Sequence, residues 1–232
     1  MTDAAPVVTI DGPSGSGKGT ISRAVAQRVG WHLLDSGALY RLVAYAGSDR
    51  GLDPADVEGH ARLAAGMQVV FGVGPDGSEQ VTLEARDVTR AIRTETAGQG
   101  ASRVAVWPAV RTALLARQRA FARPPGLVAD GRDMGTVIFP QARLKIYLTA
   151  SAAERALRRY KQLKDKGSGA SLSALSRDIT ERDARDSTRA VAPLIPASDA
   201  EVIDSTGLTI EEVVDRVLEL GVQRSLWPAP RA

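Results

Sequence analysis

Residues 7–20 read V-V-T-I-D-G-P-S-G-S-G-K-G-T, and this stretch decides the fold of the chain. Its first part is mainly apolar and ends in an aspartate, which predicts a buried strand. The residues from Gly12 to Lys18 match the pattern G-x-x-x-x-G-K of a phosphate-binding loop. Glycine permits the left-handed turns that aim successive backbone N–H groups at phosphate oxygens. A strand, this loop and a following helix together predict an α/β protein that binds a nucleotide.

The predicted ATP-binding residues form one uninterrupted segment. They are Gly12, Pro13, Ser14, Gly15, Ser16, Gly17, Lys18, Gly19 and Thr20. The helix that begins near Lys18 adds the positive end of its dipole, and Lys18 is expected to reach the β- and γ-phosphates. Most loops of this kind carry a Ser or Thr after the lysine, and that hydroxyl ligates Mg²⁺. Here the position is Gly19 and the hydroxyl comes at Thr20, so the direct magnesium ligand stays open.

Around this loop, short apolar segments alternate with helical patterns. The expected strands are 7–11, 32–35, 127–130, 144–148 and 201–204. This alternation predicts a mostly parallel, doubly wound sheet. The region 53–93 breaks the alternation, because 67–73 and 80–88 are strand-like and flank the turn sequence G-P-D-G-S at 74–78. We expect a small inserted domain with an antiparallel hairpin there.

Caps and periodicity predict where several helices begin and end. We expect a C-terminal cap at Gly30, a helix that starts at Pro108 and reaches Phe121, and capping boxes at Ser151 with Glu154 and at Thr209 with Glu212.

Two further strand ends carry an arginine. Arg41 follows the second strand in L-L-D-S-G-A-L-Y-R at 33–41, and Arg132 lies in A-D-G-R-D-M-G-T at 129–136. The carboxyl ends of parallel strands meet at one edge, where a guanidinium can bind a second phosphate in bidentate fashion. Asp130 fits a carboxylate that holds Mg²⁺ through water. An exposed helix position for Arg41 and a plain Asp-Gly turn for 130–131 are the alternatives.

If the stretch E-R-D-A-R-D-S-T-R at 181–189 is helical, one face carries Arg182, then Arg185 and Asp186, then Arg189. One interpretation is a surface ladder of salt bridges. The other is a mobile lid whose arginines neutralise the transferring phosphoryl group, an effect worth ~10³–10⁵ in rate. Glycines and serines in 164–173 suit a hinge for such a lid. Two phosphate sites and a lid favour a kinase over a switch protein, because a switch protein needs only one phosphate site.

The composition of the chain excludes several classes of protein and site. The chain has 232 residues, no cysteine, two histidines and a net charge of +3, with an apolar content of 44%. These values exclude disulfides and thiolate sites and are ordinary for a soluble domain. No apolar run approaches the length of a membrane span, and residues 1–6 do not resemble a signal peptide. We expect a cytoplasmic monomer that binds neither nucleic acid nor membrane.

Taken together, D-G-P-S-G-S-G-K-G-T, L-L-D-S-G-A-L-Y-R, A-D-G-R-D-M-G-T and R-D-x-R-D-x-x-R-A-V-A-P-L resemble bacterial cytidylate kinases, a family of nucleoside monophosphate kinases. The resemblance covers nearly the whole chain. It implies a P-loop NTPase-like CORE domain with a five-stranded parallel sheet and helices on both faces, formed by 1–52, 94–160 and 190–232. It also implies an NMP-binding insert at 53–93 and a helical LID at 161–189. The implied reaction is direct in-line phosphorylation of CMP, and of dCMP, by ATP with Mg²⁺.

The same resemblance implies roles for individual residues. Catalytic roles fall to Lys18, Arg132, Arg182 and Arg189. The CMP-binding residues would be Ser36, Arg41, Ser102, Arg111, Asp130, Arg132, Asp133, Arg182, Asp186 and Arg189. Mg²⁺ would be held by phosphates and water, with Thr20 or Asp130 as the candidate protein ligands. A carboxylate such as Asp133 suits base selection, since cytosine presents an amino donor where uracil presents a carbonyl.

Two alternatives to this function remain at the level of sequence. One is a P-loop kinase for another acceptor, such as UMP or a small metabolite. The other is a nucleotide-dependent switch or binding protein that holds RNA with its basic lid, which predicts slow ATP hydrolysis and salt-sensitive RNA binding.

Overall fold

The computed structural model describes residues 5–73, 79–164 and 171–228. The chain divides into two compact units, one made of the segments up to Asp35 and from Arg119 onward, the other of Ser36–Gln118. The predicted turn at 74–78, most of the predicted hinge at 164–173 and the last residues of the tail lie outside the described residues.

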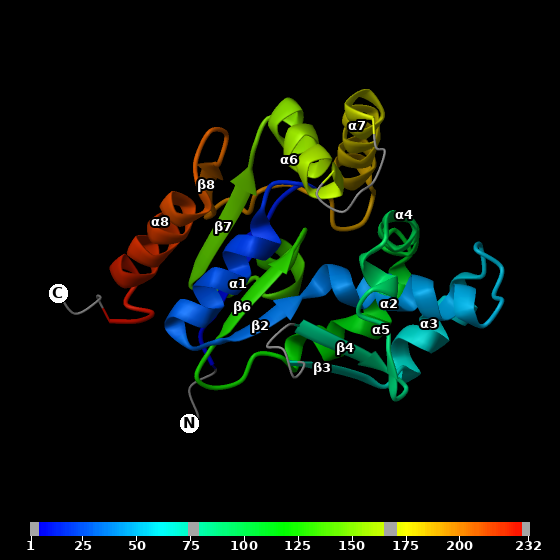
Figure 1. The fold of residues 1–232 in the computed structure, drawn as a ribbon. Helices are drawn as coiled ribbons and strands as arrows, with labels where there is room; N and C mark the ends of the chain where they lie inside the picture. Colours follow the sequence, from blue (N-terminus) through cyan, green and yellow to red (C-terminus); the bar gives the residue numbers. More distant parts are fainter. Residues whose placement is uncertain (1–4, 74–78, 165–170, 229–232) are drawn as a thin grey trace. The chain divides into compact units, whose positions relative to one another are not determined.

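The first unit is built on a parallel sheet of five strands in the order β2-β6-β1-β7-β8 (Figure 1). These strands are β1 (Val7–Asp11), β2 (His32–Asp35), β6 (Leu127–Gly131), β7 (Leu144–Thr149) and β8 (Glu201–Asp204). Both β1 and β6 are buried along their whole length, as expected for central strands covered on both faces. The register pairs Asp11 with Gly131 and Asp35 with Asp130. The predicted five-stranded parallel sheet is therefore confirmed, and three strands end together at one edge.

The described residues of this unit form four α-helices. They are α1 (Lys18–Val29), α6 (Ala152–Lys164), α7 (Leu172–Thr188) and α8 (Ile210–Gln223). The helices α1 and α8 lie against each other and against the sheet, while α6 packs along α7 (Figure 1). The apolar faces of α1 and α8 form one core with the strands, which includes Val8, Ile10, Val25, Val128, Ile146 and Val217. This core fixes α1, and with it the loop that precedes α1.

Two of the helix ends predicted for this unit are confirmed. Gly30 caps α1 in the left-handed conformation with φ 70°. Thr209 and Glu212 form a complete capping box at the start of α8. The box predicted at Ser151 is only half formed, because the carboxylate of Glu154 pairs with Arg158 at 2.9 Å instead of reaching back to the N–H of Ser151.

The second unit combines helices with a separate antiparallel sheet. Its elements are α2 (Ser36–Asp49), α3 (Val57–Gly66), β3 (Val69–Val73), β4 (Glu79–Leu83), β5 (Arg86–Asp87), the 3₁₀ turn η1 (Ala91–Arg93), α4 (Glu95–Val104) and α5 (Pro108–Arg119). The strands β3 and β4 pair as the predicted antiparallel hairpin. In this unit α2 packs mainly against α4.

Three details of this unit differ from the sequence expectation. The strand expected over 80–88 is broken, because Glu84 and Ala85 adopt positive φ values of 50° and 65° and turn the chain into β5. The strand expected from residue 67 begins two residues later, since the N–H of Met67 still donates to Leu63 at the end of α3. Helix α5 starts at Pro108 as predicted but ends before Phe121.

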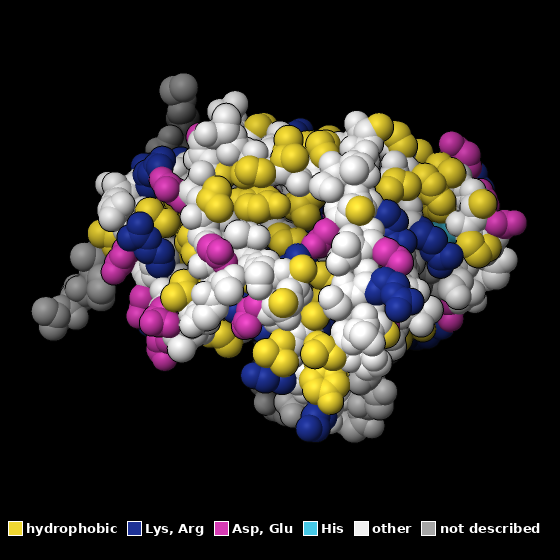
Figure 2. Space-filling view, turned by 90° about the horizontal axis from the view of Figure 1, so that it is seen from above, with side chains coloured by type: hydrophobic (Ala, Val, Ile, Leu, Met, Phe, Trp, Pro, Cys, Tyr) yellow, Lys and Arg dark blue, Asp and Glu magenta, His cyan; other side chains and the backbone are white. Residues whose placement is uncertain are grey.

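Charged side chains are scattered over the face drawn in Figure 2, where acidic side chains lie beside many of the basic ones. Within the described ranges, no helix has both the length and the apolar character needed to cross a bilayer.

Candidate active site

The phosphate-binding loop lies between β1 and α1, as predicted, and two of its glycines are required by geometry. A Cβ at Gly12 would lie 2.0 Å from the carbonyl oxygen of Leu148, so only glycine fits there. Gly17 precedes α1 with φ 91°, in the left-handed region. Lys18 is the first residue of α1, and its Nζ donates to the carbonyl of Pro13 at 3.2 Å across the loop. The lysine is therefore folded over the loop that is expected to hold phosphates.

Lys18 lies in a strongly charged environment. Burial and the positive charge of Arg132 lower its pKa to about 7. The charge of Arg182 acts in the same direction. The carboxylates of Asp130 and Asp35 oppose the shift. Three cations thus share one neighbourhood, where an anionic ligand would be stabilised.

Arg132 and Asp186 bring the loop after β6 and helix α7 together. Nε of Arg132 donates to Oδ2 of Asp186 at 3.0 Å, and both side chains are largely buried. Burial raises the pKa of Asp186, but the charge and hydrogen bond of Arg132 outweigh it, so the pKa lies below its usual value. The carboxylate is therefore ionised at neutral pH and holds the guanidinium in place.

Asp133 lies near Arg189, which directly follows the C-terminal end of α7. Nη2 of Arg189 is 3.9 Å from Oδ1 of Asp133, and the two side chains are 5% and 4% exposed. The expectation that Arg189 shares a helical face with Arg182 is wrong, since α7 ends at Thr188 and Arg189 has an extended backbone with ψ 138°. That backbone is held by the bond that Nε of Arg189 donates to the carbonyl of Ala192.

Asp11, the last residue of β1, is a buried carboxylate that the sequence identified only as a strand end. Its Oδ1 accepts the N–H of Met134 and its Oδ2 accepts the N–H of Gly135, each at 2.8 Å. Burial raises the pKa of Asp11 to about 7, although both backbone hydrogen bonds lower it. These bonds fix the short π-helical turn η2 (Met134–Ile138), which begins directly after Asp133.

The carboxylate of Asp130 faces the start of α1. A Cβ at Gly19 would lie 3.2 Å from Oδ2 of Asp130, so the two residues are in close contact. Thr20 lies beside them and is exposed. This acidic oxygen donor next to a phosphate-binding loop fits Mg²⁺, which prefers oxygen ligands and usually keeps several waters. Among the described residues, no group of three or more His, Cys, Asp or Glu side chains could hold a metal ion by itself.

Arg158 on α6 forms hydrogen bonds with the phosphate-binding loop and with the loop after β8. Its Nη1 donates to the carbonyl of Ser16 at 3.3 Å and to Oγ of Ser205 at 3.1 Å. Its Nη2 donates to the carbonyl of Ser205 at 2.7 Å, and Ser205 also donates to Ser16. The loop after β8 is thereby joined to the phosphate-binding loop, a link that no motif in the sequence indicates.

The other predicted site residues belong to the second unit. Oγ of Ser36 donates to Oε1 of Gln118 at 2.9 Å, and both residues are buried. Gln118 was not predicted, although it follows Val110 and Leu114 at the spacing of a buried helix face. Because the hydroxyl hydrogen of Ser36 points to Gln118, the oxygen of Ser36 is left to accept a hydrogen bond.

Arg111, Ser102 and Arg41 lie on three helices of the same unit. Arg111 on α5 is 7% exposed and stacks over the ring of Tyr40, 5.9 Å from its centroid. Ser102 on α4 is 9% exposed, and its hydroxyl has no hydrogen-bond partner within the described part of the chain. Arg41 lies on α2 and is half-buried, so the alternative of a fully exposed helix position is excluded.

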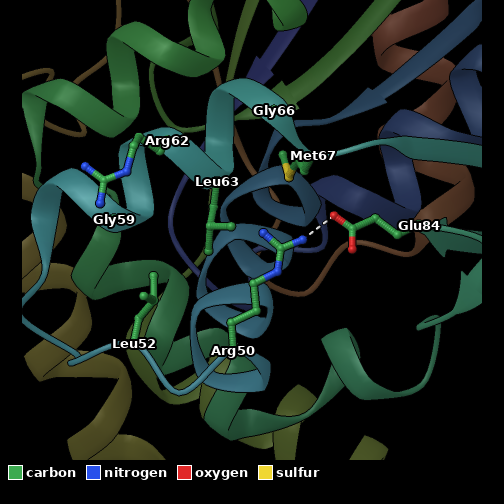
Figure 3. Close-up of a pocket in the computed structure, with 8 residues that line it drawn as sticks. All are labelled: Arg50, Leu52, Gly59, Arg62, Leu63, Gly66, Met67 and Glu84. Atoms are coloured by element: carbon green, nitrogen blue, oxygen red, sulfur yellow. Dashed lines mark hydrogen bonds and ion pairs between the residues drawn. The ribbon is translucent and has the colours of Figure 1, made fainter.

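A pocket also lies in the second unit, between α3 and the turn after β4 (Figure 3). Leu52, Leu63 and Met67 form its apolar part. Arg50 pairs with Glu84 at its edge (Figure 3). None of the predicted site residues lines this pocket, so it is separate from the residues that the motifs identify.

The structure therefore brings together most of the predicted residues of the first unit at the carboxyl edge of the sheet. The phosphate-binding loop, Asp130, Arg132, Asp133, Arg182, Asp186 and Arg189 all belong to that unit. Ser36, Arg41, Ser102 and Arg111 belong to the second unit. A donor loop with a cluster of cations can bind and neutralise phosphates, which is the main requirement of phosphoryl transfer.

Comparison with known proteins identifies relatives over nearly the whole chain. A family model described as cytidylate kinase matches residues 8–223. A cytidylate kinase of Stutzerimonas stutzeri is 58% identical over 97% of this chain and 99% of its own length. The cytidylate kinase of Pseudomonas putida KT2440 is 57% identical over 97% of this chain and all of its own length. One from Pseudomonas savastanoi pv. phaseolicola is 60% identical over 92% of this chain and 94% of its own length.

A solved structure shares the fold at much lower sequence similarity. An uncharacterized protein from Eubacterium ventriosum superposes with a TM-score of 0.53 at 9% identity, covering 94% of this chain and 98% of that protein. This similarity concerns the fold alone.

Proposed function

The chain belongs to the cytidylate kinase family and is an ATP-dependent phosphotransferase for CMP, and we propose that it moves the γ-phosphate directly, in line, onto CMP and dCMP. The position of Lys18 carries this proposal, because its Nζ lies across the phosphate-binding loop, 3.2 Å from the carbonyl of Pro13. Burial and the charges of Arg132 and Arg182 lower its pKa to about 7, which places three basic groups in one neighbourhood. Substrate phosphates bound there would be stabilised by these positive charges, although Arg132 is already paired with Asp186.

In this proposal the donor phosphates lie in the loop from Gly12 to Thr20. Its backbone N–H groups and the N-terminus of α1 bind the phosphate oxygens. Lys18 bridges the β- and γ-phosphates. Arg182 and Arg132 neutralise charge on the transferring group, which carries it on three equatorial oxygens. No covalent intermediate is needed, because positioning and electrostatic stabilisation lower the barrier directly.

The acceptor nucleotide is assigned to arginine and aspartate side chains. Arg41 and Arg132 bind its phosphate, and Arg182 and Asp186 bind its sugar. Asp133, with Arg189 beside it, accepts a hydrogen bond from the exocyclic amino group of cytosine. A uracil in the same place would turn a carbonyl oxygen toward that carboxylate, which is repulsive.

The remaining base contacts come from the second unit. Ser102 and Arg111 contact the pyrimidine, and both are already buried. Ser36 presents its hydroxyl oxygen as an acceptor, since its hydrogen is given to Gln118. An acceptor at this position favours an amino group over a carbonyl.

Mg²⁺ would be held by the ATP phosphates and water, with Asp130 or Thr20 as its protein-side partner. When bound, the ion supplies charge neutralisation and orients the phosphate chain. The contact of Gly19 with Asp130 supports this assignment, because a larger residue would intrude on the carboxylate.

The domain roles follow the same proposal. Residues 1–52, 94–160 and 190–232 form the CORE, 53–93 form the NMP-binding insert and 161–189 form the LID. The enzyme works as a cytoplasmic monomer without a nucleic-acid or membrane partner. Sedimentation at micromolar concentration, with and without RNA, tests whether the protein is a monomer and whether it binds RNA.

Direct transfer has a stereochemical test. With ATP made chiral at the γ-phosphorus, in-line transfer to CMP inverts the configuration, and each CDP carries the inverted phosphorus. Net retention would require two transfers through a phosphorylated side chain, and it would contradict the proposed mechanism. The kinase alternative for another acceptor and the RNA-binding switch are not favoured, since the family and the relatives over the whole chain are cytidylate kinases.

A further inference from the structure

Arg155 on α6 is the centre of a buried hydrogen-bond network that the proposed mechanism does not use. Its side chain is 6% exposed. Nε donates to the carbonyl of Ala150, just beyond β7, at 2.9 Å. Nη1 donates to the carbonyl of Ser14 in the phosphate-binding loop at 3.1 Å. The guanidinium is therefore fixed with respect to both the sheet and the loop.

The same guanidinium also binds α7. Nη1 and Nη2 donate to the two carboxylate oxygens of Asp183 at 3.0 and 2.6 Å. A bidentate pair of this kind fixes direction as well as distance, and lysine cannot reproduce it. Asp183 therefore connects α7 to the phosphate-binding loop through one side chain, that of Arg155.

On α7, Asp183 lies between two residues that the proposed mechanism uses. Arg182 precedes it, and Asp186, which binds Arg132, follows one helical turn later. Two carboxylates one turn apart thus hold α7 on two buried arginines, Arg155 from α6 and Arg132 from the loop after β6. With both pairs formed, neither sliding nor rotation of α7 is possible without breaking a charged hydrogen bond.

The contact between α6 and the loop leaves little space for adjustment. A Cβ at Gly15 would lie 3.1 Å from Cβ of Arg155 and 3.4 Å from its carbonyl oxygen. The loop is thus packed directly on the residue that also holds Asp183. A shift in either one is transmitted to the other through packed atoms and not through solvent.

We propose that Asp183 and Arg155 are positioning residues for phosphoryl transfer, whose ion pair sets where Arg182 lies relative to Lys18. The inference rests on the proposed function, because its consequence is a rate of transfer. Neither side chain needs to touch a substrate. Loss of the pair lets α7 move, and a misplacement of about 1 Å in a catalytic group can cost on the order of 100-fold in rate.

The test compares variants of the full chain. Asp183→Asn removes the charge, Asp183→Glu keeps it, and Arg155→Lys keeps the cation but not the bidentate geometry. Glu181→Gln is the matched control, because it removes one charge from an exposed position on the same helix. For each variant, kcat, the KM for CMP, the CMP to UMP ratio and the melting temperature are measured.

We expect kcat to change while the KM for CMP and the preference for CMP over UMP do not. Asp183→Asn and Arg155→Lys lower kcat by about 10- to 100-fold, with the KM for CMP and the CMP to UMP ratio little changed. Asp183→Glu recovers part of the loss, and Glu181→Gln matches the wild type. The double variant Asp183→Asn with Arg155→Lys loses no more than the worse single variant, because the two residues act as a unit. A kcat within twofold of wild type in Asp183→Asn, at a temperature where it is folded, would overturn the inference.

Amide hydrogen exchange gives a readout that needs no turnover. Asp183→Asn is expected to speed exchange across α7 while β1 and β6 stay protected. Unchanged exchange in α7 would also overturn the inference. If the wild-type chain shows no CMP-dependent turnover, the proposed function fails, and the exchange result still decides whether the pair holds α7.

Discussion

Nε of Arg132 donates to Oδ2 of Asp186 at 3.0 Å, although 54 residues separate them in the chain. The pair joins the loop after strand β6 to α7, and both side chains are largely buried. A buried guanidinium that is already held by a carboxylate loses little conformational freedom when it binds a phosphate. This part of the proposed acceptor site is therefore already assembled before any substrate arrives.

Replacing this arginine is expected to abolish transfer but not ATP binding. Arg132→Ala should lower kcat by about 10³-fold or more, as for other arginines that neutralise a transferring phosphoryl group. Calorimetry should still detect ATP, since the donor loop is intact. Arg28→Ala is the control, because the ion pairs of Arg28 with Glu211 and Asp215 are exposed at the surface.

Arg132→Ala also leaves Asp186 buried without this partner, so Arg132→Lys serves as a second variant that keeps the charge. An equal loss of ATP affinity and turnover in both variants would assign Arg132 to the donor site and contradict the proposal.

Asp133→Asn is expected to lower kcat/KM for CMP more than kcat/KM for UMP. The amide retains the shape of the carboxylate but offers the cytosine amino group a weaker acceptor, and its NH₂ can donate to the uracil carbonyl. The ratio of kcat/KM for CMP to that for UMP should fall by about 10-fold or more, or ~1.4 kcal/mol. If the ratio stays constant, Asp133 does not read the base.

The ionisation of Lys18 predicts that ATP binding takes up a proton above neutral pH. In the free enzyme its pKa is lowered to about 7, so above that pH the lysine is largely neutral. ATP phosphates favour the charged form and raise the pKa, so affinity should fall by up to about 10-fold per pH unit above pH 7 and stay level below it.

Proton uptake can be measured by calorimetry at pH 8 in buffers of different ionisation enthalpy. Lys18→Arg is the control, because arginine stays protonated and should bind ATP without uptake. Equal uptake by both proteins would show that another group titrates.

Gly19→Ala is expected to slow the reaction without preventing ATP binding. The added Cβ lies 3.2 Å from Oδ2 of Asp130, so the carboxylate must shift by a few tenths of an ångström. We expect kcat to fall by about 10-fold, and the Mg²⁺ concentration for half-maximal rate to rise. Gly66→Ala is the matched control, since a Cβ there meets no atom within 4 Å. Identical kinetics for both variants would remove Asp130 from the magnesium site.

The parts of this fold that local patterns encode could be predicted from the sequence. Strand β1 and the loop to Thr20 were evident, because apolar runs and glycines at fixed spacing have a direct conformational meaning. The five parallel strands followed from the alternation of segments. Gly30 and the capping box at Thr209 were predicted for the same reason, since each is a local hydrogen-bond arrangement.

Contacts made between distant segments could not be predicted in this way. Asp11 is an ordinary strand-end acid in the sequence, and its two bonds to residues 134 and 135 depend on the parallel register of β1 and β6. The pair of Arg155 and Asp183 depends on how α6 packs along α7. Arg189 was misplaced on a helical face because its extended backbone is fixed by a bond three residues later, which helical periodicity does not encode.

The most direct test of the account is an ADP-release assay with MgATP in which CMP, dCMP, UMP and AMP are compared as acceptors. The account predicts turnover at about 1–100 s⁻¹ with CMP, as is typical of kinases, comparable activity with dCMP and far less with UMP or AMP. ADP release at the same slow rate with and without an acceptor would contradict it, because the acceptor site would then have no part in the reaction.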